Sequence, residues 1–277
     1  MRDDEDDDRL PRALEQIAAD ERWELPAESR AVLVDGLRSG DREVRLEALE
    51  VLRDSLDDGL AAMALELARS EGDEEVRVAA ALALGPGLGA AAAASEDEIA
   101  APISQATVAA LGVGLRQLYF DSTAPKAVRR AALETATQAP EAWQEGAVRA
   151  AWASGDAEWR TTAVDCMARL DGFCAELVEA LRDRAPQIRL SAARATGDAG
   201  CREAAPRLLA LARAADEEAL VRMAAMESLG LLGDRESIAP LRELAAGADP
   251  ELAFAARSAL ARIAGAKVAE EIDDDYG

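Results

Sequence analysis

The segment DREVRLEALEVL, residues 41–52, decides the fold, because variants of it recur along the whole chain. It combines an acidic residue, a Val-Arg step and apolar residues at helical spacing. Six related segments follow: DEEVRVAAALALG (73–85), APKAVRRAALETA (124–136), DAEWRTTAVDCMA (156–168), APQIRLSAARATG (185–197), EALVRMAAMESLG (218–230) and DPELAFAARSALA (249–261). A motif that returns about every 30 residues is typical of a solenoid.

A second amphipathic segment precedes each copy of the motif. Leu33 and Leu37 before the first copy, and Leu177 and Leu181 before the fifth, have the spacing of one helical stripe. Gly-Asp pairs separate the two segments at 40–41, 72–73 and 155–156. Glycine suits a helix end and aspartate is a good N-cap, so each unit reads as helix, turn, helix. We predict an all-α, right-handed α-solenoid of about seven helix pairs.

The arginine of the motif measures the repeat. It stands at residues 45, 77, 129, 160, 189 and 222, so successive copies are 32, 52, 31, 29 and 33 residues apart. The long interval indicates an inserted loop at 86–103, with Pro86 ending the preceding helix; a degenerate helix among its alanines is the alternative. We place the solenoid at 10–265, between a disordered acidic N-terminus at 1–9 and an acidic C-terminal tail at 266–277 that frays.

Two stretches carry a family resemblance. GDAGCREAAPRLLALA (197–212) and LGDRESIAPLRELA (232–245) each join a Gly-Asp turn to an Ala-Pro-x-Leu helix. In this the chain resembles HEAT-repeat proteins, and among them the short HEAT-like repeats of the phycobilin-lyase type, over roughly 27–265. The resemblance implies that the second helices line the concave side, and that Arg and Asp near the turns bridge neighbouring repeats. Members are mostly protein-binding scaffolds, with a few enzymes, so the fold does not decide the function.

The net charge of the chain indicates which classes of partner to expect. With 31 Lys and Arg against 54 Asp and Glu, the formal net charge is −23. Nucleic acid and anionic membranes attract basic surfaces, so we expect neither as a partner, although Lys126, Arg129 and Arg130 form a local basic patch. A protein partner with a basic surface is the electrostatic complement. The alternative is that the acidity reflects a salt-adapted or GC-rich organism and serves solubility only.

Residue types also limit the chemistry. The chain has no histidine, which removes the Ser-His-Asp triad, His-containing zinc sites and the His-Glu iron ligands of the HEAT-repeat hydroxylases. Cys166, Cys174 and Cys201 are odd in number and lack paired spacing, which argues against a disulfide framework. We therefore predict no enzyme activity, no catalytic residues, no cofactor and no metal site. With no apolar run of 18 residues and a charged start, we expect a cytoplasmic monomer.

The recurrent arginines are interpreted as structural. Asp41, Asp73 and Asp156 stand four residues before an arginine of the motif, on the same helical face. We predict that these pairs form an ion-pair ladder along the stack. An anion-binding track is the alternative.

The candidate partner-binding residues are those that the repeat does not explain. They are acidic residues of the first two second helices and two aromatic residues with no apolar equivalent in other repeats: Glu43, Glu47, Glu50, Asp54, Glu74, Tyr119 and Trp143. Aromatic residues concentrate in interface hot spots. Trp152 and Trp159 occupy apolar positions of the repeat, so we expect them in the core.

The function predicted from these residues is a non-enzymatic protein-binding scaffold or adaptor that uses the concave face. A divergent phycobilin-lyase-like protein, or another HEAT-like enzyme subunit, is the alternative.

Overall fold

A computed structural model describes residues 9–18, 25–94 and 102–275, and the side chains up to residue 265. Each described segment is helical or a turn, and these residues contain no strand. The contacts divide the chain into two compact units, 1–144 and 145–277. The prediction of an all-α fold is confirmed.

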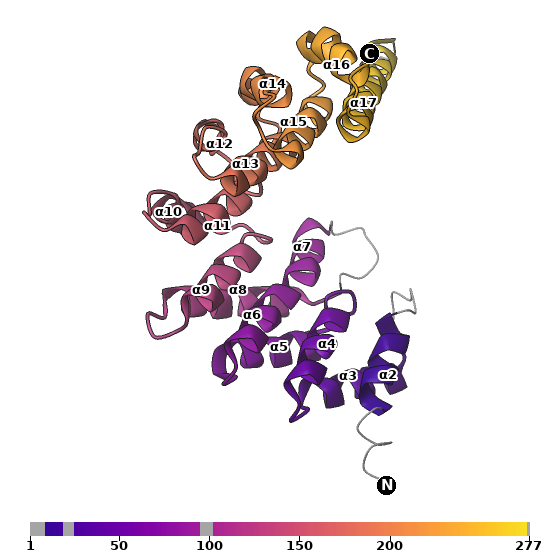
Figure 1. The fold of residues 1–277 in the computed structure, drawn as a ribbon. Helices are drawn as coiled ribbons and strands as arrows, with labels where there is room; N and C mark the ends of the chain where they lie inside the picture. Colours follow the sequence, from indigo (N-terminus) through magenta and orange to yellow (C-terminus); the bar gives the residue numbers. More distant parts are fainter. Residues whose placement is uncertain (1–8, 19–24, 95–101, 276–277) are drawn as a thin grey trace. The chain divides into compact units, whose positions relative to one another are not determined.

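Both units consist of pairs of consecutive helices joined by short turns (Figure 1). The pairs are repeat 1, α3 (Ala27–Leu37) and α4 (Arg42–Leu52); repeat 2, α5 (Asp58–Ser70) and α6 (Glu74–Ala83); repeat 3, α8 (Gln105–Phe120) and α9 (Lys126–Ala136); repeat 4, α10 (Ala142–Trp152) and α11 (Ala157–Met167); repeat 5, α12 (Cys174–Ala180) and α13 (Pro186–Asp198); repeat 6, α14 (Ala205–Arg213) and α15 (Ala219–Leu231); repeat 7, α16 (Ile238–Ala245) and α17 (Pro250–Asp275). The short 3-10 turns η1 (Arg202–Ala204) and η2 (Arg235–Ser237) lead into α14 and α16. Seven pairs are the number that the sequence predicts.

Within each unit, the second helices pack side by side. In unit 1, α4 contacts α6 and α6 contacts α9; in unit 2, α11, α13, α15 and α17 contact one another in that order. We call these helices the second-helix layer, and α3, α5, α8, α10, α12, α14 and α16 the first-helix layer. The helix α2 (Arg9–Ala18) covers α3 and α4 at the start of unit 1. Nearest-neighbour packing of this kind is the source of stability in repeat proteins.

The long interval between repeats 2 and 3 contains a helix, α7 (Gly85–Ala93), so the prediction of a loop is wrong for 86–93. Pro86 lies in the first turn of α7, where its missing N–H costs no hydrogen bond. Leu84 is both the C-cap residue of α6 and the N-cap residue of α7. Within α7, Leu88 and Ala91 are buried. The apolar alanine-rich stretch is therefore part of the core. Residues 95–101 lie outside the described part of the chain.

The ends of the chain also differ from the expectation. The backbone of α17 remains helical to Asp275, so the prediction of a fraying tail is wrong for 266–275. The predicted disordered N-terminus lies outside the described residues, except for Arg9, where α2 begins.

Aspartates at the turns begin the second helices as the sequence predicts. The carboxylates of Asp41, Asp73 and Asp156 each accept hydrogen bonds from two backbone N–H groups of the following helical turn. The Val76 N–H bond is the main cause that holds the pKa of Asp73 below its ordinary value. These side chains satisfy donors that the helix itself leaves unpaired.

The predicted pairing with an arginine of the same helix is wrong for Asp41 and Asp73, because Arg45 pairs with Glu71 and Asp73 pairs with Arg42. Glu71 pairs with Arg45 at 3.5 Å and Glu217 with Arg189 at 2.6 Å, while Asp183 pairs with Arg160. In each case the acidic residue belongs to the turn of the next repeat. The arginines therefore join neighbouring repeats. The aspartates serve mainly as caps, although Asp73 also pairs with Arg42 of repeat 1 at 3.2 Å.

Three other arginines of the motif fix the angle between the two helices of a repeat. The Nε atoms of Arg77, Arg129 and Arg222 donate to the carbonyl oxygens of Ala68, Tyr119 and Ala212, at 2.9, 2.8 and 3.1 Å. Each acceptor lies near the C-terminal end of the first helix of the same repeat, where carbonyl groups lack helical partners. One guanidinium thus ties the second helix to the first helix of its own repeat.

Small residues let the second helices of unit 2 approach closely. A Cβ placed on Gly230 would lie 2.9 Å from the Cα of Ala259, and one on Gly197 would lie 2.6 Å from Oγ of Ser228. The Ser228 hydroxyl donates to the carbonyl oxygen of Ala193 at 2.6 Å, across the same interface. Glycine and serine at these positions are therefore required by the packing.

We predict that Gly230→Ala destabilises unit 2. Overpacking costs about 1–3 kcal/mol, and the better helix propensity of alanine offsets up to about 1 kcal/mol of it. The expected net loss in the free energy of unfolding is about 1–2 kcal/mol, measured by urea titration. Gly146→Ala is the matched control, because nothing lies within 4 Å of a Cβ at Gly146 in α10; there we expect a gain of about 0.5–1 kcal/mol. Equal changes at both positions would contradict the packing argument.

We predict that Glu217→Gln destabilises the protein by about 1–3 kcal/mol at pH 7, because it removes a charged partner of Arg189. The hydrogen bond from Arg189 lowers the pKa of Glu217 from 4.5, although burial opposes this. A lowered pKa contributes stability above the unfolded value, and this contribution is lost as the pH falls through the lower folded value. Urea titrations of variant and wild type should therefore converge between pH 7 and pH 3. The exposed Glu179→Gln is the control, with little change at either pH.

Candidate protein-binding surface

An acidic stripe runs along α4. Glu43, Glu47 and Glu50 are spaced four and three residues apart, and Asp54 follows just beyond the helix end. At 3.6 residues per turn, these four positions fall on one face. All four side chains are exposed, whereas Val44, Ala48, Leu49, Val51 and Leu52 bury the other faces of α4. The structure thus brings together four of the predicted site residues, which we call the acidic stripe.

Three of these carboxylates form no ion pair with the described residues. Arg42 pairs with Glu43 and with Glu75 of α6. Among the residues that the structure describes, no ion pair or hydrogen bond reaches the carboxylates of Glu47, Glu50 or Asp54. Glu74, the fifth predicted acidic residue, is exposed at the first turn of α6, where the helix N-terminus favours a negative charge. Uncompensated carboxylates at this spacing attract a basic ligand.

Apolar side chains lie beside the stripe. Leu46 on α4 and Val78 and Leu82 on α6 are half-buried, and α4 and α6 pack against each other. This part of the second-helix layer therefore combines negative charge with apolar surface. It matches a ligand that carries both basic and apolar groups.

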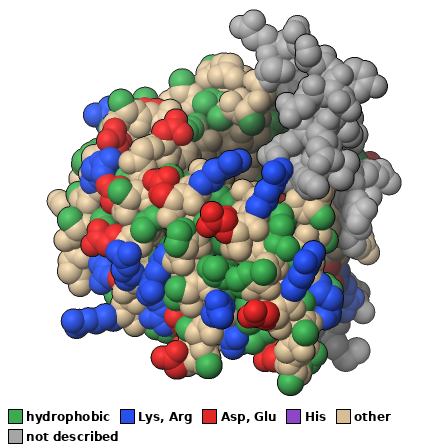
Figure 2. All heavy atoms as spheres, turned by 90° about the horizontal axis from the view of Figure 1, so that it is seen from above, with side chains coloured by type: hydrophobic (Ala, Val, Ile, Leu, Met, Phe, Trp, Pro, Cys, Tyr) green, Lys and Arg blue, Asp and Glu red, His purple; other side chains and the backbone are tan. Residues whose placement is uncertain are grey.

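One face of the molecule carries both signs of charge. On the face shown in Figure 2, Lys and Arg side chains alternate with Asp and Glu side chains, and hydrophobic side chains lie between them. A surface of alternating charges steers a charged partner weakly, because opposite charges cancel at a distance. A stripe of a single sign is therefore a more selective feature than the net charge.

The aromatic candidates are placed differently from the prediction. Tyr119 is only 8% exposed, so its expected role as an exposed anchor is wrong. Its ring lies 5.5 Å from that of Trp143, which is half-buried, and 5.9 Å from the guanidinium carbon of Arg129. The exposed member of this group is Phe120, at 59%, with its ring 4.8 Å from Tyr119. Phe120 was missed because Tyr119 and Phe120 adjoin in sequence and only the helix geometry decides which one faces outward.

The two tryptophans expected in the core are both half-buried. Trp152 carries the guanidinium of Arg160 over its ring at 5.4 Å. This contact explains its partial exposure, because an arginine beside the ring keeps its charged group in water.

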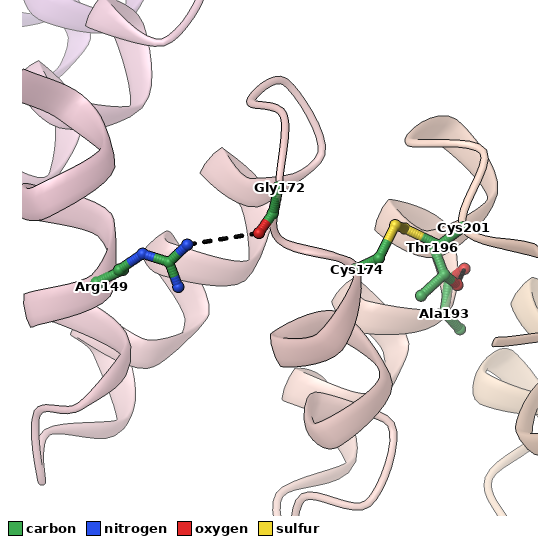
Figure 3. The surroundings of a disulfide bond; sticks show 6 residues. All are labelled: Arg149, Gly172, Cys174, Ala193, Thr196 and Cys201. Atoms are coloured by element: carbon green, nitrogen blue, oxygen red, sulfur yellow. Dashed lines mark hydrogen bonds between the residues drawn. A yellow bond between two sulfur atoms is a disulfide. The ribbon is translucent and has the colours of Figure 1, made fainter. Parts of the chain in front are cut away.

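A disulfide joins Cys174 and Cys201, contrary to the prediction (Figure 3). Cys174 begins α12, and Cys201 precedes η1 at the start of the next first helix. The backbone N–H of Cys201 donates to the carbonyl oxygen of Thr196 at 2.9 Å, which holds the turn after α13. Cys166 remains a free thiol and is buried. The disulfide thus ties the first-helix layer of repeat 5 to that of repeat 6.

The signal for this disulfide was present in the sequence. Cys174 and Cys201 are 27 residues apart, close to one repeat, and positions one repeat apart are neighbours in a solenoid. Counting cysteines and looking for short Cys-x-x-Cys spacing overlooked this. In a repeat protein, the repeat length itself is the spacing to test.

No cluster of metal-ligating type appears in the described part of the chain, where no three His, Cys, Asp or Glu side chains are grouped to hold an ion. Residues 74–93, which span α6 and α7, are long and apolar enough to cross a membrane, but half of that stretch is buried among the other helices, as in a core helix.

A family model for HEAT repeats matches residues 174–261, which cover repeats 5 to 7. Residues 174–261 are therefore HEAT repeats, and the helix pairs of repeats 1 to 4 have the same two-helix architecture. A search among curated proteins found no match. The finer resemblance to the phycobilin-lyase type of repeat stays a prediction.

Two solved structures share the fold of this chain. YibA of E. coli aligns over 92% of this chain and 96% of its own, with 14% identity and a TM-score of 0.51. A Kap121p mutant aligns over 86% of this chain with 15% identity and the same TM-score. The aligned part is 27% of the Kap121p chain. At such identities the likeness concerns the fold only.

The prediction that the chain is not an enzyme, which was drawn from its residue types, is contradicted, because an enzyme is among the similar structures. Human deoxyhypusine hydroxylase, an enzyme, also aligns, over 92% of this chain and 89% of its own, with 15% identity and a TM-score of 0.41. A fold by itself does not decide whether a protein is an enzyme. This distant alignment does not assign an activity to the chain either.

We predict that reducing the Cys174–Cys201 disulfide destabilises unit 2. For a loop of 27 residues, the loop-closure entropy corresponds to about 3.5 kcal/mol. Dithiothreitol should lower the urea midpoint of the wild type and leave that of a Cys174→Ala/Cys201→Ala variant unchanged. Mass spectrometry after alkylation without reductant should find one modified thiol, Cys166, in the denatured protein. Three modified thiols would show that the disulfide does not form.

Proposed function

We propose that this chain is a protein-binding scaffold, and that the acidic stripe on α4 binds a basic segment of its partner. The observation that supports this most directly is the set of exposed carboxylates at Glu47, Glu50 and Asp54, which form no ion pair with the described residues. Repulsion among like charges on one helix face is unfavourable, by a few tenths of a kcal/mol per pair. A basic ligand relieves it.

The neighbouring apolar positions set the kind of ligand. Leu46, Val78 and Leu82 keep part of their surface in water. A basic segment that also carries apolar side chains would cover them, and such burial adds about 25 cal/mol for each Å². We therefore propose a partner segment in which Lys or Arg alternates with apolar residues. Because the helices are held by the arginine ladder, the surface is formed before binding and little order is lost on this side.

The shared fold is compatible with a scaffold role, because stacked helical repeats present extended binding surfaces. The rival explanation is that the acidity serves solubility alone. Solubility requires net charge but not a particular placement, so changing the stripe and changing other exposed acids should then have the same effect.

This difference gives the test. The binding variant is Glu47→Gln/Glu50→Gln/Asp54→Asn. The matched control is Glu28→Gln/Asp35→Asn/Glu66→Gln, which changes three exposed acids of the first-helix layer and has the same net charge. Proteins captured from the source cells by each form are compared by mass spectrometry at low and at high salt.

We expect a set of basic proteins that the wild type and the control capture and the binding variant loses. The capture should weaken steeply as salt rises, because exposed charges are screened. Identical sets for the binding variant and the control would overturn the proposal and favour the solubility explanation.

A further inference from the structure

A second surface, in unit 2, differs in character from the acidic stripe. Five large hydrophobic side chains are exposed in the described part of the chain, and three of them lie on α15 and α17: Leu220 at 55%, Leu231 at 48% and Phe254 at 67%. Scattered single hydrophobic residues are normal on a protein surface, but a group on adjacent helices points to a contact site.

Leu220 and Phe254 line a groove of about 790 Å³ between these two helices. Met223 and Ala255 also face it, both half-buried. The groove exists because α17 presents the small side chains of Ala255, Ser258 and Ala259 toward it, and because Gly230 brings the two helices close together. A space of this size, open to solvent and mostly apolar, holds several side chains of a ligand.

The charged residues of the groove are arranged unevenly along it. At one end, Arg262 pairs with Glu227 at 3.5 Å, which neutralises both. Toward the other end, Glu251 in the first turn of α17 is exposed, and among the described residues no ion pair reaches its carboxylate. The groove therefore carries one uncompensated negative charge, at the end where α15 and α17 begin.

We propose that this groove binds an amphipathic helix of a protein partner, with its apolar face on Leu220, Met223 and Phe254 and a Lys or Arg beside Glu251. An amphipathic helix presents apolar side chains at successive turns, as a groove between two helices requires. The basic residue is the complement of Glu251. The chain's net charge of −23 favours a basic partner too.

The other candidate occupant is a second copy of the chain. Its Leu220 and Phe254 would meet the same residues across a two-fold axis. Such a dimer would bring two chains of −23 together and place Glu251 of each near the other's acidic surface, which opposes association. Charge therefore favours the basic helix. This proposal is independent of the acidic stripe, because the two surfaces share no residue.

The test uses the full chain and a fluorescent model peptide of 14 residues with leucines on one helical face and lysines on the other. A second peptide has the same composition in an order that is not amphipathic. Binding is measured by fluorescence anisotropy at physiological salt. The groove variant is Leu220→Ala/Phe254→Ala, and the control is Phe120→Ala, which removes an equally exposed phenylalanine in unit 1. Because all three side chains are exposed, these variants should fold, and circular dichroism checks this.

We expect the groove variant to raise the Kd of the amphipathic peptide at least tenfold, and Phe120→Ala to change it less than twofold. Glu251→Gln should raise the Kd two- to fivefold, while the exposed Glu236→Gln should not. The scrambled peptide should bind at least tenfold more weakly. Equal binding by all variants, or by both peptides, would overturn the proposal in favour of general attraction to an acidic protein.

Two further outcomes would also overturn it. If peptide binding falls for Glu47→Gln/Glu50→Gln/Asp54→Asn but not for the groove variant, the stripe is the binding site and only the function proposed above survives. If light scattering shows a dimer that Phe254→Ala dissociates, the occupant of the groove is a second copy of the chain.

Discussion

The bond from the recurrent arginine to the end of the preceding helix is the constraint on which the rest of the structure depends. Arg77, Arg129 and Arg222 each donate a hydrogen bond from Nε to a carbonyl oxygen near the last turn of the first helix in the same repeat. Such carbonyls have no helical partner, and leaving them buried and unpaired would cost about 1–3 kcal/mol. Arg189 divides its donors differently: Nη1 donates to the carbonyl oxygens of Asp183 and Arg184 in its own repeat, while Nε and Nη2 donate to Glu217 of the next repeat. One side chain therefore sets the angle within a repeat and the step to the following one.

This arrangement decides which positions are available for binding. The Val, Ala and Leu side chains of the second helices are buried between helices. The recurrent arginines are bonded to neighbouring helices and turns, so neither group is available to a partner. The positions equivalent to Glu43, Leu46 and Glu50 face outward and do not contribute to the stack. In repeat 1 these positions carry two carboxylates and a leucine. In repeat 6 the first two carry Leu220 and Met223, and in repeat 7 the second carries Phe254. The same scaffold thus presents an electrostatic surface at one place and an apolar one at another, without any change in backbone geometry.

The repeat could be predicted from the sequence because its signal is periodic and local. Val44, Arg45 and Ala48 recur at fixed offsets, and periodicity of this kind identifies both helices and core. The partners of Arg45 and Arg189 could not be read in the same way, because Glu71 and Glu217 stand in the next repeat. They are neighbours only once the stack is formed. Pro86 was misread for a different reason: a proline ends one helix but also fits the first turn of another, and only the buried Leu88 decides between the two. Tyr119 and Phe120 differ by one residue, which on a helix is enough to exchange burial for exposure.

The disulfide has a bearing on where the protein works. Disulfides persist in oxidising compartments and are uncommon in the reducing cytosol. The cytoplasmic location expected from the sequence therefore stays a prediction that the Cys174–Cys201 bond does not favour. The bond joins residues at the starts of the first helices of repeats 5 and 6, and neither cysteine lines the groove between α15 and α17. It can therefore stabilise these repeats without occupying the surface that α15 and α17 present.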